Sequence, residues 1–225
     1  MGEIYQMKEG SLRSKIILFD LDGTIIDSTE AILESFTQAY KAFNLEVPAA
    51  ESIKSLIGLP LEMMFVKLGV SEADSMSYAA AYKEHYKTIL TKKTTLLPKA
   101  KEAIVLAHGY AKLGVVTTKT ASYSRELLEH FDIMKYFDVL IGREDVTEPK
   151  PNPEGVLKAV KELRHRSGIA TFFIGDSCVD MMAAEEAEIA GIGVLTGYTS
   201  KDELLDCADF VTKDAFAAVV MAEKI

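Results

Sequence analysis

With 225 residues, of which 48% are hydrophobic, the chain can form one large domain or two modest ones. Its net charge of −9 argues against nucleic acid or an anionic membrane as a partner. The two cysteines, Cys178 and Cys207, give no disulfide framework and suit a reducing cytosol, and no apolar run is long enough to span a bilayer. Residues 1–14 lack the apolar centre of a signal peptide, so we expect a loose tail on a cytoplasmic protein.

Strand-like apolar runs alternate with helical patterns along most of the chain. This alternation is typical of a parallel sheet covered on both faces, so it predicts an α/β fold with a doubly wound sheet. Ligands of such folds bind at the carboxyl ends of the strands. The predicted strands are Lys15–Asp20, Leu113–Thr117, Val139–Gly142, Thr171–Asp176, Gly191–Leu195 and Asp209–Val211. The predicted helices are Lys99–His108, Ser122–His130, Pro153–Arg166, Val179–Ala190 and Ala215–Glu223.

The segment from Asp27 to Thr95 interrupts this alternation, because it shows helical periodicity and no convincing strand. One helical stripe joins Ile32, Phe36, Ala39, Tyr40 and Phe43, and further helices are predicted at Pro60–Leu68 and Glu72–Leu90. Both ends of the segment belong to one sheet, which favours an inserted cap over a separate bundle on a linker. We therefore expect an α/β core formed by residues 15–26 and 96–225, with a helical cap at residues 27–95.

Two carboxylates, Asp20 and Asp22, follow the first predicted strand and precede Gly23. Carboxylates at the end of a buried strand are costly unless something pairs with them. Gly23 permits a turn and leaves a bare backbone amide. Hard oxygen ligands and free amides are the groups that bind Mg²⁺ and phosphoryl oxygens. Taken alone, the pattern is explained equally well by an Asx turn that closes a strand.

Three later segments favour the functional interpretation. Thr117 ends the second apolar strand, Lys150 lies between prolines, and Asp176 with Asp180 follows another apolar strand. Together with Asp20 they offer a nucleophile, a hydroxyl, a lysine and an acidic pair, at strand ends or helix starts. This set resembles the haloacid dehalogenase-like hydrolases, in the phosphoglycolate phosphatase branch with a helical cap. The resemblance covers nearly the whole chain from residue 15 onward.

The resemblance implies a Mg²⁺-dependent phosphatase that hydrolyses a small phosphate monoester, with phosphoglycolate as the first expectation. Asp20 would attack phosphorus and form an aspartyl phosphate. Asp22 would protonate the leaving group and then activate water. Asp20, the backbone carbonyl of Asp22 and Asp176 would bind the metal. Lys150 would neutralise charge on Asp20 and on the phosphate, to which Thr117 would donate its hydroxyl.

The neighbouring polar residues are expected to complete the phosphate site. Gly23, Thr24 and Thr118 would contact the phosphate together with Thr117 and Lys150, although the family more often has Asn at the position of Thr118. Lys119 is interpreted equally well as a substrate contact or a solvated side chain.

The residues that follow Asp176 have two interpretations each. Asp180 would orient metal-bound water or pair with Lys150, unless it only stabilises a helix N-terminus. Ser177 would hold a metal-bound water or simply begin the helix.

The cap is expected to select the substrate. Gly58, Leu59 and Leu61 lie in a break between two predicted cap helices and carry no charge, which suits a small substrate. Pyrophosphate, a nucleotide or a sugar phosphate are alternative substrates, and a phosphomutase is an alternative reaction at the same site. The non-enzyme alternative is a phosphate-binding module. The expected partner is a small phosphorylated metabolite, and the chain is expected to be a monomer or a weak homodimer.

Overall fold

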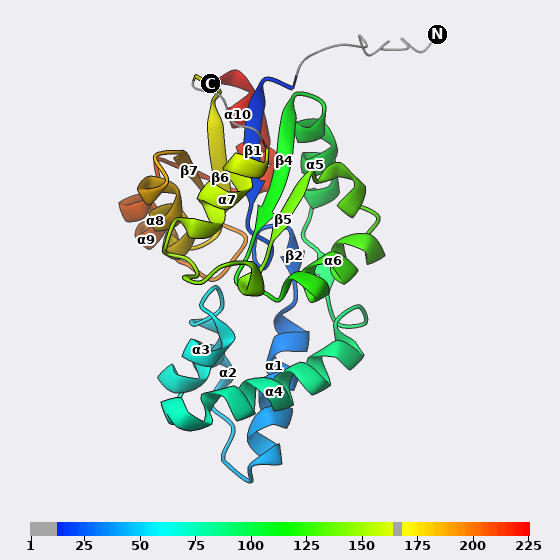
Figure 1. Cartoon of the computed structure of the whole chain (residues 1–225), viewed down its shortest axis with the longest axis vertical. Helices are drawn as coiled ribbons and strands as arrows, with labels where there is room; N and C mark the ends of the chain where they lie inside the picture. The colour runs from blue at the N-terminus through cyan, green and yellow to red at the C-terminus, as the bar shows by residue number, and fades with distance from the viewer. Residues whose placement is uncertain (1–12, 164–167) are drawn as a thin grey trace.

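The computed structural model describes residues 13–163 and 168–225, so the predicted tail at residues 1–14 lies almost wholly outside the described residues. A six-stranded sheet has the order β5-β4-β1-β6-β7-β8, with parallel pairing throughout (Figure 1). This sheet confirms the predicted α/β fold. Its strands are β1 Lys15–Phe19, β4 Ala111–Val116, β5 Val139–Ile141, β6 Thr171–Gly175, β7 Ala190–Val194 and β8 Phe210–Thr212.

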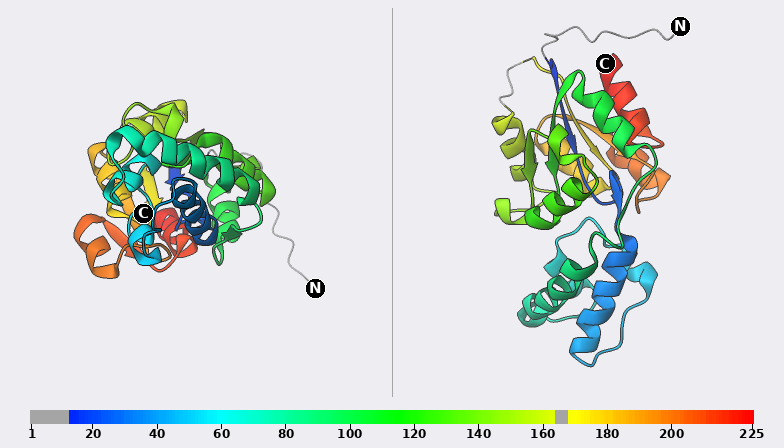
Figure 2. Two further views of the ribbon diagram at one scale, coloured as in Figure 1. Left: turned by 90° about the horizontal axis from the view of Figure 1, so that it is seen from below. Right: turned by 90° about the vertical axis from the view of Figure 1, so that its right-hand side faces the viewer.

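Helices cover both faces of the sheet (Figure 2), which explains why β1 is apolar and buried at every position from Ile16 to Phe19. Ile17 and Phe19 of β1 pack in one apolar cluster with side chains of α5, α6 and α10, whereas Ile16 and Leu18 pack in a second cluster with α7 and α8. The helices of this part of the chain are α5 Ala100–His108, α6 Ala121–His130, α7 Glu154–Glu162, α8 Cys178–Glu186, α9 Lys201–Cys207 and α10 Ala215–Lys224, with short 3₁₀ turns at η1 Met134–Tyr136 and η2 Arg143–Asp145.

A helical segment lies beyond the carboxyl end of the sheet (Figure 1) and consists of α1 Thr29–Ala42, α2 Ala50–Lys54, α3 Leu61–Lys67 and α4 Glu72–Ile89. Two short strands flank it, β2 Ile26–Asp27 and β3 Thr95–Leu96, and pair antiparallel with each other. The sequence pattern did not indicate these strands, because two residues are too few to show a period. Their pairing brings the two ends of the helical segment together.

Aromatic rings form the interior of the helical segment. Phe36 of α1 is fully buried, with its ring centroid 4.6 Å from that of Phe65 and 5.2 Å from that of Tyr82. The predicted stripe on α1 is buried except for Phe43, which is 40% exposed and stacks on Tyr78 at 4.1 Å. These contacts join α1, α3 and α4 into one packed unit.

The prediction for the two cysteines is wrong, because a disulfide joins Cys178 at the start of α8 to Cys207 at the end of α9, with 5.7 Å between their Cα atoms. Residues 29 positions apart meet because α9 packs against α8. Sequence spacing alone does not show that contact. The cysteines therefore no longer support the expectation of a reducing environment. Within the described part of the chain, no helix has the length and apolar character needed to cross a membrane.

Candidate active site

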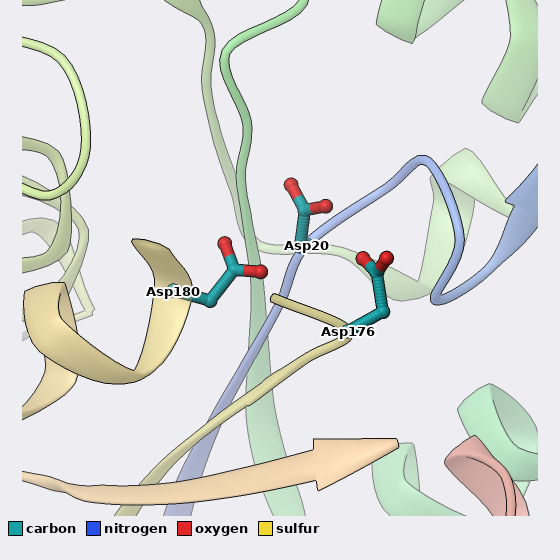
Figure 3. A group of neighbouring side chains, drawn as sticks. All are labelled: Asp20, Asp176 and Asp180. Atoms are coloured by element: carbon teal, nitrogen blue, oxygen red, sulfur yellow. The ribbon is translucent and has the colours of Figure 1, made fainter. Parts of the chain in front are cut away.

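Three buried aspartates meet at the carboxyl end of the sheet, where the sequence pattern places ligand sites. Asp20 follows β1, Asp176 follows β6, and Asp180 lies in the first turn of α8. Their side chains point toward one another (Figure 3), and one oxygen of each lies within 4.8 Å of the others. The structure therefore brings together Asp20 and Asp176, which the sequence pointed to as metal ligands, and adds the carboxylate of Asp180.

Asp176 is surrounded by backbone that approaches unusually closely. A Cβ atom on Gly23, which has φ +78°, would lie 2.5 Å from Asp176 Oδ2, and one on Gly197 would lie 1.7 Å from it. The Tyr198 amide donates a hydrogen bond to Asp176 Oδ2 at 3.2 Å, and the Thr24 hydroxyl donates to Oδ1 at 3.4 Å. Only glycine fits at these two positions without displacing the carboxylate.

Gly197 and Tyr198 were not identified from the sequence as site residues. They follow β7, and the loop after a parallel strand lies at the same edge of the sheet as the loops after β1 and β6. This position is the signal that could have found them.

Lys150 lies between two of the three carboxylates. Its Nζ is 2.7 Å from Asp20 Oδ1 and 2.5 Å from Asp180 Oδ1, and it also donates to the Val116 carbonyl at 3.2 Å. The lysine is 5% exposed, so all these contacts are shielded from water. The pairing with Asp180 is one of the two arrangements that the sequence left open for that aspartate.

Ser177 and Asp180 form a capping box at the start of α8. The Ser177 amide donates to Asp180 Oδ2 at 3.1 Å, and the Ser177 hydroxyl donates to the same oxygen at 2.6 Å. In return, the Asp180 amide donates to Ser177 Oγ at 3.4 Å. Asp180 therefore both caps α8 and pairs with Lys150. The Ser177 hydroxyl, which begins the helix, also fixes the orientation of the Asp180 carboxylate.

The site carries excess negative charge, because three buried carboxylates face the single lysine within it. Burial, reinforced by Asp180, raises the pKa of Asp20 to about 7 against the opposing effect of Lys150. Burial and the charges of Asp180 and Asp20 likewise raise the pKa of Asp176 well above its ordinary value. A bound cation would offset this repulsion. Since all the donors are oxygen atoms, the residues fit a hard divalent ion such as Mg²⁺.

Asp22 is held apart from the three aspartates. Its Oδ1 accepts a hydrogen bond from the Ser28 hydroxyl, and its Oδ2 lies 3.1 Å from Lys119 Nζ. The side chains of Lys119 and Asp22 are only 9% and 12% exposed. Lys119 is thus not the solvated side chain of the second interpretation, and it contacts Tyr86 Oη on α4 at 2.9 Å.

The two threonines after β4 have different contacts. Thr117 is 6% exposed, and its Oγ1 accepts a hydrogen bond from the Lys119 amide at 3.2 Å. The Thr118 hydroxyl donates to the Gly58 carbonyl at 3.0 Å, across the boundary between sheet and helical segment. In this arrangement the Thr118 hydroxyl is engaged by the loop at Gly58, whereas the expectation was a phosphate contact.

A cavity of about 70 Å³ lies between the helical segment and the sheet, with Asp22, Thr118 and Lys119 on one wall. The loop residues Gly58, Leu59 and Leu61 also line it, together with aromatic rings of α1, α4 and α6. Gly58 has φ +107°, and a Cβ atom there would lie 3.6 Å from Ser177 Oγ. The loop therefore rests on the acidic turn that carries Asp176 and Asp180.

Known proteins resemble this chain in sequence and in fold. A probable phosphatase, IndB of Dickeya dadantii, is 30% identical over 214 residues, which cover 92% of each chain. A phosphoglycolate phosphatase of Photorhabdus laumondii is 30% identical over 192 residues, covering 82% of this chain and 81% of its own. A solved haloacid dehalogenase-like family hydrolase from Streptococcus pneumoniae has the same fold, with a TM-score of 0.82 and 24% identity over 93% of this chain and 98% of that one. The family model of the haloacid dehalogenase-like hydrolases matches residues 17–194, and the chain belongs to this family.

Proposed function

We propose that the protein is a Mg²⁺-dependent phosphatase that hydrolyses a small phosphate monoester through an aspartyl phosphate on Asp20. The observation that carries the proposal is the environment of Asp20, whose carboxylate is buried 2.7 Å from Lys150 Nζ and beside two further carboxylates. A carboxylate beside a lysine, at a site that would also hold Mg²⁺, can attack phosphorus while these positive charges stabilise the transition state. Relatives named phosphatases support the same reaction class.

The proposed reaction has two steps. In the first, an oxygen of Asp20 bonds to phosphorus, the ester bond breaks, and Asp22 gives its proton to the departing alkoxide. In the second, Asp22 takes a proton from water as the water oxygen bonds to phosphorus and the bond to Asp20 breaks. Lys150 balances negative charge on Asp20 throughout. Bound Mg²⁺ would supply positive charge for the phosphoryl oxygens, and Asp20, Asp176 and the Asp22 carbonyl would hold it.

The other polar residues of the site support phosphate binding in this proposal. Thr117 directly follows Val116 of β4, whose carbonyl accepts a hydrogen bond from Lys150, and Gly23 and Thr24 lie in the turn after Asp20. Thr118 would reach the phosphate only after it releases the Gly58 carbonyl. Asp180 and Ser177 would keep Lys150 and the acidic turn in place, as their mutual hydrogen bonds suggest.

The cavity supports a small substrate, with phosphoglycolate as the first candidate. Lys119 and Arg143 on its walls favour an anionic leaving group. The relative from Photorhabdus laumondii that is named a phosphoglycolate phosphatase supports the same first candidate. We propose that Leu59 and Leu61, which line the cavity, select by size.

We also propose that residues 27–95 act as a cap on a core of residues 15–26 and 96–225, and that the cap closes over bound substrate. The paired strands at both ends of the helical segment support these boundaries. The cytoplasm is the proposed compartment, and a monomer or weak homodimer is the proposed state. Cell fractionation and light scattering test these two proposals.

The proposal is tested with a panel of phosphate esters, with Mg²⁺ and after complete chelation. Asp20→Asn should abolish turnover of every ester while leaving the melting temperature close to that of the unmodified protein. Asp138→Asn, at an exposed position, is the matched control. Near-normal kcat in Asp20→Asn would exclude this nucleophile. Full activity after metal removal would exclude the metal, and conversion of glucose 1-phosphate to glucose 6-phosphate would favour a mutase.

A further inference from the structure

A contact between Lys119 and Tyr86 links the helical segment to Asp22. Lys119 follows β4 in the core, whereas Tyr86 belongs to α4 of the helical segment (Figure 1). Lys119 Nζ lies 2.9 Å from Tyr86 Oη and 4.7 Å from the centre of the Tyr86 ring. The same Nζ lies 3.1 Å from Asp22 Oδ2. One ammonium group therefore joins a cap helix to the residue proposed as the acid and base.

Tyr86 is held rigidly enough to set the position of Lys119. Its side chain is 1% exposed, and its ring stacks on that of Tyr82 at 5.4 Å with an interplanar angle of 13°. It also packs against Tyr123 of α6, at 5.6 Å between ring centres. A tyrosine fixed by two neighbouring rings presents its hydroxyl and its π face at a defined point. The ammonium group of Lys119 contacts both the hydroxyl and the π face of Tyr86.

Asp22 is in turn held at both carboxylate oxygens. Ser28, just before α1, donates to Oδ1, and Lys119 contacts Oδ2. These two contacts fix the plane of the carboxyl group. Because Lys119 can only donate to Oδ2, the proton that Asp22 passes to the leaving group must lie on Oδ1, which then gives up the hydrogen bond from Ser28. One of the two holds depends on α4, because Tyr86 orients Lys119.

We propose that Lys119 and Tyr86 are positioning residues: α4 places Lys119 through Tyr86, and Lys119 aligns the Asp22 carboxyl for proton transfer to the leaving group. The inference rests on the proposed function, which assigns this proton transfer to Asp22. It implies that Asp22 is aligned only while α4 lies against the core. Proton transfer is then coupled to cap closure, and an open cap leaves Asp22 misaligned.

The test compares two small substrates that differ in their need for a proton. An alkyl phosphate releases an alkoxide and needs an acid, whereas acetyl phosphate releases acetate and needs none. The alkyl substrate is the ester with the highest kcat/KM in the panel. Lys119→Met should lower kcat/KM for this ester by roughly 10- to 100-fold, and Tyr86→Phe by about 3- to 10-fold, while both variants keep the value for acetyl phosphate within about threefold. The ratio of the two kcat/KM values therefore reports the alignment of the acid, because general damage to the site would lower both values together.

Three further variants make the result interpretable. Asp22→Asn should show the same selective loss as Lys119→Met, and Lys119→Arg should restore part of the alkyl activity. Lys87→Met is the matched control, since Lys87 follows Tyr86 on α4 but is exposed and paired with Glu84. It should leave both substrates unchanged.

Two outcomes separate failure of the inference from failure of the proposed function. If Asp22→Asn lowers kcat/KM only for the alkyl ester, whereas Lys119→Met lowers kcat/KM for both substrates equally or for neither, the positioning role is wrong and the proposed function stands. If Asp22→Asn itself lowers both equally, Asp22 does not protonate the leaving group, and both are wrong.

Discussion

Replacing Lys150 with methionine should destabilise the fold as well as stop turnover. The side chains of Lys150, Asp20 and Asp180 are 4%, 5% and 1% exposed, so the lysine is removed from between two buried carboxylates. Breaking a buried ion pair by removing one partner costs about 3–5 kcal/mol, because the remaining charge stays uncompensated. For a chain of this size that cost corresponds to a fall in melting temperature of roughly 6–20 °C.

The assay is thermal and urea unfolding of the metal-free protein at neutral pH. Lys135→Met is the matched control, because Lys135 pairs with Asp132 at the surface, with side-chain exposures of 55% and 67%, and exposed pairs contribute little. Adding Asp180→Asn to Lys150→Met should recover part of the lost stability, since it removes one of the two uncompensated charges.

Two results would refute this reasoning. A Lys150→Met protein as stable as the Lys135→Met control would mean that the buried carboxylates do not depend on the lysine. A double variant less stable than Lys150→Met would mean that the loss comes from packing, and not from charge. Added Mg²⁺ should raise the melting temperature of every variant that keeps Asp20 and Asp176, because a ligand that binds the folded state stabilises it.

Three further predictions concern other parts of the molecule. Phe36→Ala should lower the free energy of unfolding by about 3–5 kcal/mol in urea titrations, because the ring is fully buried among other aromatic rings, and a loss below that of a surface substitution would contradict this packing. Reducing the disulfide between α8 and α9, whose cysteines are 29 positions apart, should lower the free energy of unfolding by about 3–4 kcal/mol. An unchanged unfolding midpoint with dithiothreitol would argue against the bond. Gly197→Ala should weaken Mg²⁺ binding in calorimetry by roughly tenfold or more, because the added Cβ would lie 1.7 Å from Asp176 Oδ2. An unchanged affinity would show that Asp176 is not a metal ligand.

The six strands of the sheet could be predicted from the sequence to within about two residues of their bounds, although not their order in the sheet. The run from Ile16 to Phe19 is buried on both faces, and a parallel strand between two helical layers makes each of these positions apolar. The same logic located Asp20, Thr117 and Asp176 at one edge, because parallel strands share the direction in which they end. The helices α1, α3 and α4 followed from their period, as the buried stripe on α1 illustrates, whereas the five-residue helix α2 was not predicted.

Other features were decided by the tertiary structure. The sequence left Lys119 between two interpretations and did not indicate Gly197 as a neighbour of Asp176, and it gave no reason to pair Cys178 with Cys207. Each of these contacts joins residues from different elements. A hydrophobic period reports which side of its own strand or helix a residue faces, and nothing about the partner on that side. The partner depends on how α4, α8, α9 and the loop after β7 pack around the sheet, and that packing results from side-chain volumes across the whole core.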